Sequence, residues 1–154
     1  MKVLSAKLST PIAWGTRKDG SHVLSFPVTL TLKCERNGKK LGVSAVFSEG
    51  FRCDGLSVPV AFRWFLKSWD SKNMLYNFAG AFHDWLYATK GNGCKFSREE
   101  CDDIFRGILR ESGIGRFKAG LADKAVELFA GGKEHWGEDN YKVAGLVAAG
   151  VSVA

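Results

Sequence analysis

Between residues 28 and 47, apolar and polar side chains alternate on both sides of Asn37-Gly38, and this pattern predicts two antiparallel β-strands joined by a tight turn. A two-residue turn brings together four apolar pairs: Cys34 with Leu41, Leu32 with Val43, Leu30 with Ala45, and Val28 with Phe47. The polar residues between them take the other face, namely Thr29, Thr31, Lys33, Lys40 and Ser44. Because a slip of one residue would exchange the two faces, the pattern predicts a single register.

A second, weaker hairpin signal is Asp19-Gly20, which would join a strand at residues 12–16 to one at residues 22–26. Pro27 indicates a strand end, a bulge or an edge position nearby. The first third of the chain is therefore expected to form an antiparallel β-meander with one covered face and one face in water.

From Pro59 onward the apolar residues follow a helical period. We expect helices at Val60–Trp69, Asn73–Thr89, after Ser97, and at Arg116–Phe129. Ser97 and Glu100 form an S-x-x-E capping box, and the helix behind them has an apolar stripe at Cys101, Ile104, Phe105 and Ile108. Glycine-containing stops follow two of these helices, at Lys90-Gly91-Asn92-Gly93 and at Ser112-Gly113.

These elements predict an α+β fold, in which an N-terminal antiparallel β-meander packs against a C-terminal helical half with an antiparallel helix pair. We expect one domain over residues 1–154, with the meander at 1–50, a motif loop and helices at 51–132, and a C-terminal tail at 133–154. A chain of 154 residues, 45% of them hydrophobic, is long enough to bury a core without a disulfide or metal.

Charge and composition exclude several classes of protein. The net charge of +6 comes from scattered Lys and Arg residues, which favours a solubilising surface over a nucleic-acid interface. No stretch approaches the ~20 apolar residues of a membrane span, and residues 1–9 lack a signal-peptide core, so synthesis in a cytoplasm is expected. The four cysteines form no C-x-x-C pair, which favours free thiols over a zinc ribbon or a redox motif.

The candidate chemistry centres on a His83-Asp84 pair inside an apolar helix, where Asp is an unfavourable residue. Tyr87 lies one turn after His83 and shares its face. If the two helices are antiparallel, Asp102 reaches an imidazole nitrogen of His83, fixes its tautomer and raises its basicity, as the third group of a catalytic triad does. Asp84 is then left to bind a hard cation, calcium first, with carbonyl groups of the Asp54-Gly55 loop.

Two other interpretations of these residues stay open. His83, Asp84 and Asp102 are equally explained as a buried polar network that ties two helices to a loop. A zinc site would need Cys53, His83, Cys94 and Cys101, whose spacing fits no common template.

Three motifs occur in order along the chain: F-x-x-D-G-x-S-x-P at residues 51–59, H-D-W-L-Y at residues 83–87, and R-x-x-x-D-x-x-F at residues 98–105. Together they resemble an uncharacterised family found mostly in bacteriophages and prophages, over roughly residues 45–132 of this chain. The resemblance implies a phage origin and supplies no activity.

The H-D-x-x-Y helix facing a second helix with an aspartate is also similar to the core of the phospholipases A2. That likeness implies that His83 is the general base for water, Asp84 holds calcium, Asp102 orients His83, and Tyr87 supports them. The chain departs from that family in its calcium loop, which is shortened to Asp54-Gly55, and in the absence of the flanking cysteines and of a secretion signal.

Two functions from different classes follow. One is a metal-assisted phage hydrolase that acts on an ester or related bond of the cell envelope. The other is a virion or tail-assembly protein, made in the host cytoplasm, in which the His/Asp group is structural. The uncharged tail at residues 143–154 is expected to be covered, either by the domain's own core or, as favoured here, by a neighbouring subunit or another virion protein.

Overall fold

The computed structural model describes residues 1–53, 69–115, 136 and 149–154, and within these ranges it has the expected α+β architecture. The main sheet contains β1 (Lys2–Leu8), β4 (Val28–Arg36), β5 (Lys39–Phe47) and β7 (Ala149–Val153), in the order β1-β4-β5-β7. A smaller sheet contains β2 (Trp14–Thr16), β3 (His22–Leu24) and β6 (Arg52–Cys53), in the order β2-β3-β6. The helices are α1 (Met74–Ala88), α2 (Lys90–Cys94) and α3 (Arg98–Glu111).

The central hairpin has the predicted register. β4 and β5 pair Cys34 with Leu41, Leu32 with Val43, Leu30 with Ala45 and Val28 with Phe47, and Asn37 and Gly38 both have the positive φ that the tight turn requires. Seven of these eight apolar residues are buried, and the eighth, Leu41, is partly buried. The prediction of one covered and one solvent-facing side is therefore confirmed.

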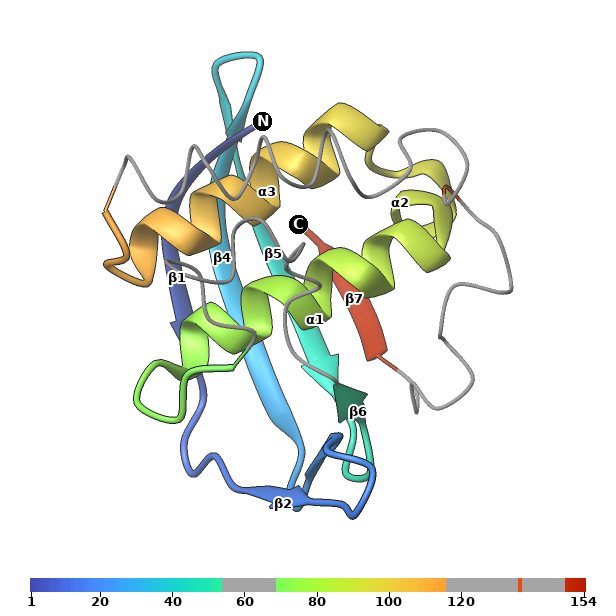
Figure 1. Cartoon of the computed structure of the whole chain (residues 1–154). Coiled ribbons are helices and arrows are strands. Elements are labelled where there is room, and N and C mark those ends of the chain that lie inside the picture. The colour runs from blue at the N-terminus through green and yellow to red at the C-terminus, as the bar shows by residue number, and fades with distance from the viewer. Residues whose placement is uncertain (54–68, 116–135, 137–148) are drawn as a thin grey trace, which may run out of the picture.

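The second hairpin forms at the predicted position, but it does not belong to one meander with β4 and β5. β2 and β3 pair around Asp19-Gly20, with Trp14 opposite Leu24 and Thr16 opposite His22. β3 then pairs with β6, so these strands form a separate sheet below the main one (Figure 1). Here Trp69 stacks on His22, with ring centroids 3.6 Å apart, and meets Trp14 edge-on at 5.2 Å. Trp69 thus packs on two strands of the small sheet.

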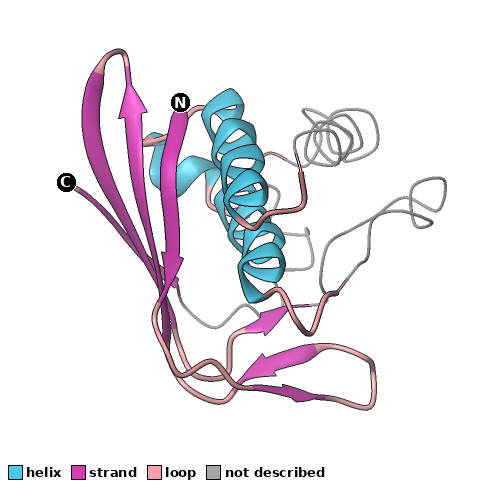
Figure 2. Ribbon diagram, turned by 90° about the vertical axis from the view of Figure 1, so that its left-hand side faces the viewer, coloured by secondary structure: helices cyan, strands magenta, loops and turns pink. Residues whose placement is uncertain are grey.

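The helices α1 and α3 lie side by side in opposite directions and form a layer over one face of the main sheet (Figures 1 and 2). Asn73 caps α1 by accepting a hydrogen bond from the Tyr76 amide at 3.1 Å. Ser97 and Glu100 form the predicted capping box of α3, and Gly113 with φ of +80° follows its last turn. The antiparallel helix pair is confirmed.

The helices expected at 60–69 and 116–129 lie outside the described residues, apart from Trp69, which is in a loop.

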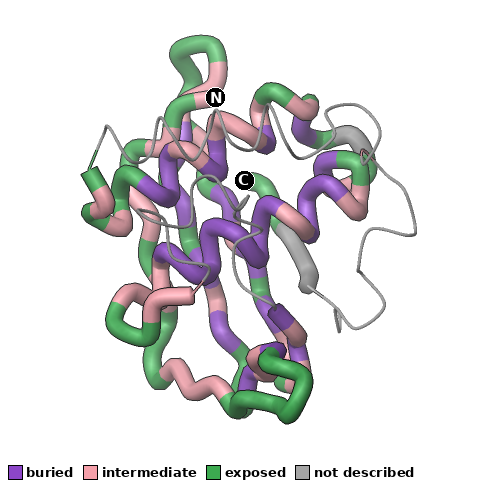
Figure 3. The backbone as a smooth tube through the Cα atoms, in the orientation of Figure 1, coloured by how far each residue is buried: buried purple, intermediate pink, exposed green. Residues whose placement is uncertain are grey.

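The core lies between this helical layer and the inner face of the sheet, where buried residues follow the facing sides of both (Figure 3). Phe47 is at its centre and contacts the rings of Phe51, Phe78 and Phe82, with centroids 4.8, 5.0 and 6.1 Å away. None of the described helices is long and apolar enough to cross a membrane.

The end of the C-terminal tail corrects one expectation. Residues Ala149–Val153 form β7 and pair with β5 of the same chain, from Val43 with Val153 to Phe47 with Ala149. The sequence favours a neighbouring subunit as the cover for this tail, yet its last residues complete this chain's own sheet. The physical reason is that the edge of β5 has free backbone groups that a short, uncharged strand satisfies. Residues 143–148 lie outside the described part.

Helix α3 packs closely on β1 at Gly107, where a Cβ atom would lie 2.5 Å from two carbon atoms of Val3. We expect Gly107→Ala to lower the free energy of unfolding by about 1–2 kcal/mol, because overpacking outweighs the better helix propensity of Ala. Chemical denaturation of Gly107→Ala, of Val3→Gly and of the double variant provides the measurement, because Val3→Gly removes both carbon atoms that the new Cβ atom would meet. The free energy of unfolding of the double variant should fall by less than the sum of the decreases in the two single variants. A decrease equal to that sum would show that the two positions do not interact.

Candidate functional site

His83 lies in the third turn of α1 and is one of the few buried polar residues of the described chain, with 6% of its surface exposed. Phe82 and Leu86, its neighbours on α1, are fully buried. The His83 ring contacts Tyr87 and Phe105, with centroids 4.3 and 4.8 Å away. A polar ring in this setting requires hydrogen-bond partners.

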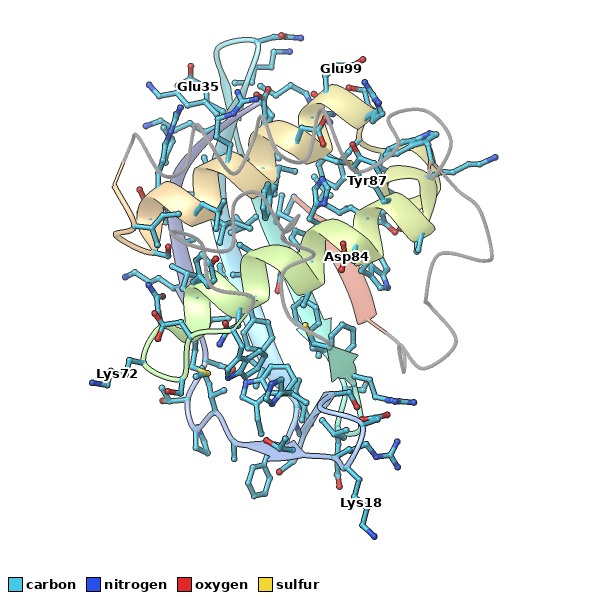
Figure 4. All side chains as sticks on the ribbon, in the orientation of Figure 1. Lys18, Glu35, Lys72, Asp84, Tyr87 and Glu99 are labelled. Carbon is cyan, nitrogen blue, oxygen red and sulfur yellow. The ribbon has the colours of Figure 1, made fainter. Side chains whose placement is uncertain are left out.

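That partner is Asp102, on the facing side of α3. His83 Nε2 lies 3.0 Å from Asp102 Oδ1, as the sequence predicted for an antiparallel helix pair. The Tyr87 hydroxyl donates a hydrogen bond of 2.7 Å to the same Oδ1, so one carboxylate oxygen joins two residues of α1 to α3. Figure 4 shows Tyr87 between the two helices. The sequence placed Tyr87 on the correct face, although it did not predict which atom it would contact.

The pKa values of this group follow from its surroundings. Burial raises the pKa of Asp102, but hydrogen bonds from His83 and Tyr87, together with the charges of His83 and Arg98, lower it by more, so the pKa lies below its ordinary value of 3.8. Burial, and then the hydrogen bond to Asp102, raise the pKa of Tyr87. Asp102 is therefore a carboxylate and Tyr87 a neutral phenol at pH 7.

These protonation states fix the tautomer of His83. An ionised carboxylate only accepts hydrogen bonds, so the Nε2 atom that faces Asp102 must carry a proton. In the neutral ring, Nδ1 is then unprotonated and can accept a proton. The Nδ1 atom lies 4.0 Å from Asp84 Oδ1, which is too long for a direct hydrogen bond.

Asp84 is on another side of α1, turned away from the sheet (Figure 4), with 26% of its side chain exposed. The two other proposed cation ligands, Asp54 and Gly55, lie outside the described residues. Within the described part of the chain, no three His, Cys, Asp or Glu side chains come together to hold a metal ion. The described residues therefore do not by themselves fit a calcium site. Cys53 and Cys101 are both buried, and the zinc hypothesis gains nothing from them.

The turn between the helices sets how Asp102 faces His83. Lys90, Gly91, Asn92 and Gly93 have consecutive φ values of +50°, +64°, +58° and +68°, so the chain reverses through a left-handed turn. The Thr89 hydroxyl accepts a hydrogen bond from the Asn92 amide at 3.1 Å. Sequence reasoning recognised this segment only as a helix stop, because the glycines signal positive φ without showing how many residues adopt it.

A residue that sequence reasoning missed is Arg36, at the end of β4. Its guanidinium donates hydrogen bonds to Glu100 Oε2 at 2.7 Å and to the Lys95 carbonyl at 2.9 Å, and it lies over the Phe96 ring. Glu100 is at the same time the capping-box residue of α3. The hairpin therefore holds the start of the helix that carries Asp102. No signal in the sequence links two positions so far apart.

Comparison with known families gives one match. Residues 28–126, well over half of the chain, match the family described as "Protein of unknown function (DUF1353)". The chain belongs to the DUF1353 family. No curated protein and no solved structure matches it. The expected membership in an uncharacterised family is confirmed, and the DUF1353 match includes all of α1 and α3, hence His83, Tyr87 and Asp102.

The left-handed turn of this DUF1353 protein offers a matched pair of glycines. A Cβ atom at Gly91 would lie 2.0 Å from the Phe96 carbonyl oxygen, whereas at Gly93 nothing lies within 4 Å. We expect Gly93→Ala to lower the free energy of unfolding by about 1–2 kcal/mol, because of the positive φ alone. Gly91→Ala should lower it by at least about 3 kcal/mol, because the added Cβ atom would also clash with Phe96. Thermal and urea unfolding measure the difference. Equal losses in the two variants would show that the close approach to Phe96 is unimportant.

Asp102 should make the stability of the DUF1353 protein depend on acid. Because its folded pKa lies below 3.8, its stabilisation is complete above that pH and is lost as pH falls through the folded pKa. We expect Asp102→Asn to lower the free energy of unfolding by about 1–3 kcal/mol at pH 7. The difference in free energy of unfolding between this variant and the unmodified protein should become smaller below pH 3.8. Urea titrations at several pH values measure this. Glu111→Gln, an exposed position on the same helix, is the control and should show no such convergence.

Proposed function

We propose that this protein is a phage-encoded hydrolase in which His83, oriented by Asp102, activates a water molecule to attack an ester or related bond of the cell envelope. The observation that carries the proposal is the hydrogen bond from His83 Nε2 to the Asp102 carboxylate. It leaves the basic Nδ1 atom for chemistry, as in a triad whose third group orients the histidine. The likeness to the phospholipase A2 helix pair supports the same roles.

The proposed reaction needs only proton transfer at Nδ1. A water molecule gives its proton to Nδ1 while its oxygen bonds to the carbonyl carbon, whose π electrons move to the carbonyl oxygen. The imidazolium that forms is stabilised by the adjacent Asp102 carboxylate, which stays ionised because its pKa is lowered. Collapse of the tetrahedral intermediate breaks the ester C–O bond, and the leaving oxygen takes the proton back from Nδ1. Tyr87 holds Asp102 in place through its own hydrogen bond.

Calcium is implied by the phospholipase resemblance, and Asp84 is the described residue that would bind it. Because the described residues do not fit a metal site by themselves, no step of the proposed reaction passes through a cation. The phage origin and synthesis in the host cytoplasm come from the bacteriophage resemblance and form part of the same proposal.

A second function is favoured by the low exposure of His83 and by the aromatic rings on two sides of it. In that case His83, Tyr87 and Asp102 are a structural network that locks α1 to α3 in a virion or tail-assembly protein. Both functions need the same hydrogen bonds, and they differ in whether Nδ1 takes part in chemistry.

The variant His83→Gln separates the two. Its amide nitrogen can still donate to Asp102, but it has no basic nitrogen, so a hydrolase should lose at least about a hundredfold in rate with little loss of stability. Hydrolysis of p-nitrophenyl butyrate and of phosphatidylglycerol vesicles, with calcium or with chelator, is the measurement. Tyr87→Phe is the matched comparison, because it removes one hydrogen bond to Asp102 and leaves Nδ1 intact. Absence of hydrolysis by the unmodified protein in every condition would favour the structural network.

A further inference from the structure

The two edges of the main sheet differ in how they are protected from pairing with another strand. The edge strand β1 has a register irregularity between Val3 and Ser5, and exposed lysines at Lys2 and Lys7. Bulges and lysines are the usual means by which edge strands avoid unwanted pairing. At the opposite edge, β7 has the sequence A-G-V-S-V, with no charge, no proline and no bulge in its pairing with β5.

The backbone of β7 also has an ordered set of groups that β5 does not use. Gly42 and Ala154 exchange both of their N–H···O bonds, at 2.7 and 3.0 Å. In an antiparallel pair, residues that bond across alternate with residues that do not. Ser152 and Gly150 therefore bond to β5, while the N–H and C=O groups of Ala149, Val151 and Val153 are directed to the outer edge. No described strand pairs with that edge.

We propose that β7 pairs antiparallel with β7 of a second copy of this chain, so that two four-stranded sheets become one continuous sheet. A register centred on Val151 places Val151 opposite its own counterpart and Ala149 opposite Val153. Every outward N–H and C=O group of the strand then has a partner, because the outward residues are arranged symmetrically about Val151. The strand is uncharged, so two copies do not repel each other at this edge.

The other exposed surface of the sheet is unsuited to self-association. Among the described strand residues of its solvent-facing side, Lys2, Lys7, Lys33 and Lys40 outnumber the one carboxylate, Glu35, so this face has an excess of positive charge that a second copy would share. Like charges in opposition are unfavourable, which directs pairing to the edge and away from the face. The twofold axis of an antiparallel edge pair is perpendicular to the sheet, so both helical layers lie on the same side. The two His83–Asp102 groups are then presented on one face of the dimer.

The experiment uses the full chain and one substitution that acts only at the outer edge. Val151→Pro removes an N–H group that points away from β5, a position where edge strands tolerate proline. Sedimentation equilibrium should show a dimer for the unmodified protein, and dissociation on the order of a hundredfold easier for Val151→Pro. Ser152→Thr, which keeps every backbone group, is the control and should remain dimeric. A folded Val151→Pro variant that is as dimeric as the unmodified protein would overturn the proposal.

A second measurement does not depend on any variant folding. Amide hydrogen exchange of the unmodified protein should show slow exchange for the outward amides of Val151 and Val153, becoming faster on dilution. The amides of Ser152 and Ala154 bond to β5 and should be protected at every concentration, which makes them the internal reference. Fast exchange of the outward amides at high concentration, or a monomer throughout, would show that β7 is not a self-association edge.

Discussion

The constraint on which the rest of the structure depends is the register of the β4–β5 hairpin. The turn at Asn37-Gly38 places the apolar residues of both strands, except Val46, on one side of the sheet. That side must be covered, and α1 and α3 cover it with their own apolar stripes. Once two helices lie side by side on the sheet, any polar side chain between them has to find its partner within the helical layer.

His83, Tyr87 and Asp102 satisfy that requirement with very few atoms. One carboxylate oxygen accepts from both the imidazole and the phenol, so neither donor is left unpaired in a region largely closed to water. The arrangement also has a chemical consequence. Because Nε2 makes the hydrogen bond between the helices, Nδ1 is left as the basic nitrogen. A structural requirement and a reactive group therefore occur in the same three residues. This is why geometry alone is compatible with both an enzyme and a structural network.

Local signals predicted much of this fold. The hairpin register, the capping box of α3 and its apolar stripe depend on residues within a few positions of each other, where turn and helix geometry leave little freedom. The facing of His83 and Asp102 was predictable because the helical period and a short connection determine it. The pairing of β7 with β5 and of β6 with β3 was not, because strand partners far apart in sequence leave no local pattern. The contact of Arg36 with Glu100 was missed for the same reason.

The shared use of Glu100 has a consequence for cooperativity. Its carboxylate closes the capping box of α3 and also receives the guanidinium of Arg36 from the hairpin. Opening the hairpin therefore removes a partner from the first turn of α3, and fraying of that turn releases the hairpin. Asp102 lies only two residues beyond Glu100. The end of the β4–β5 hairpin and the carboxylate that holds His83 are thus thermodynamically linked, and a local opening of either is transmitted to the other.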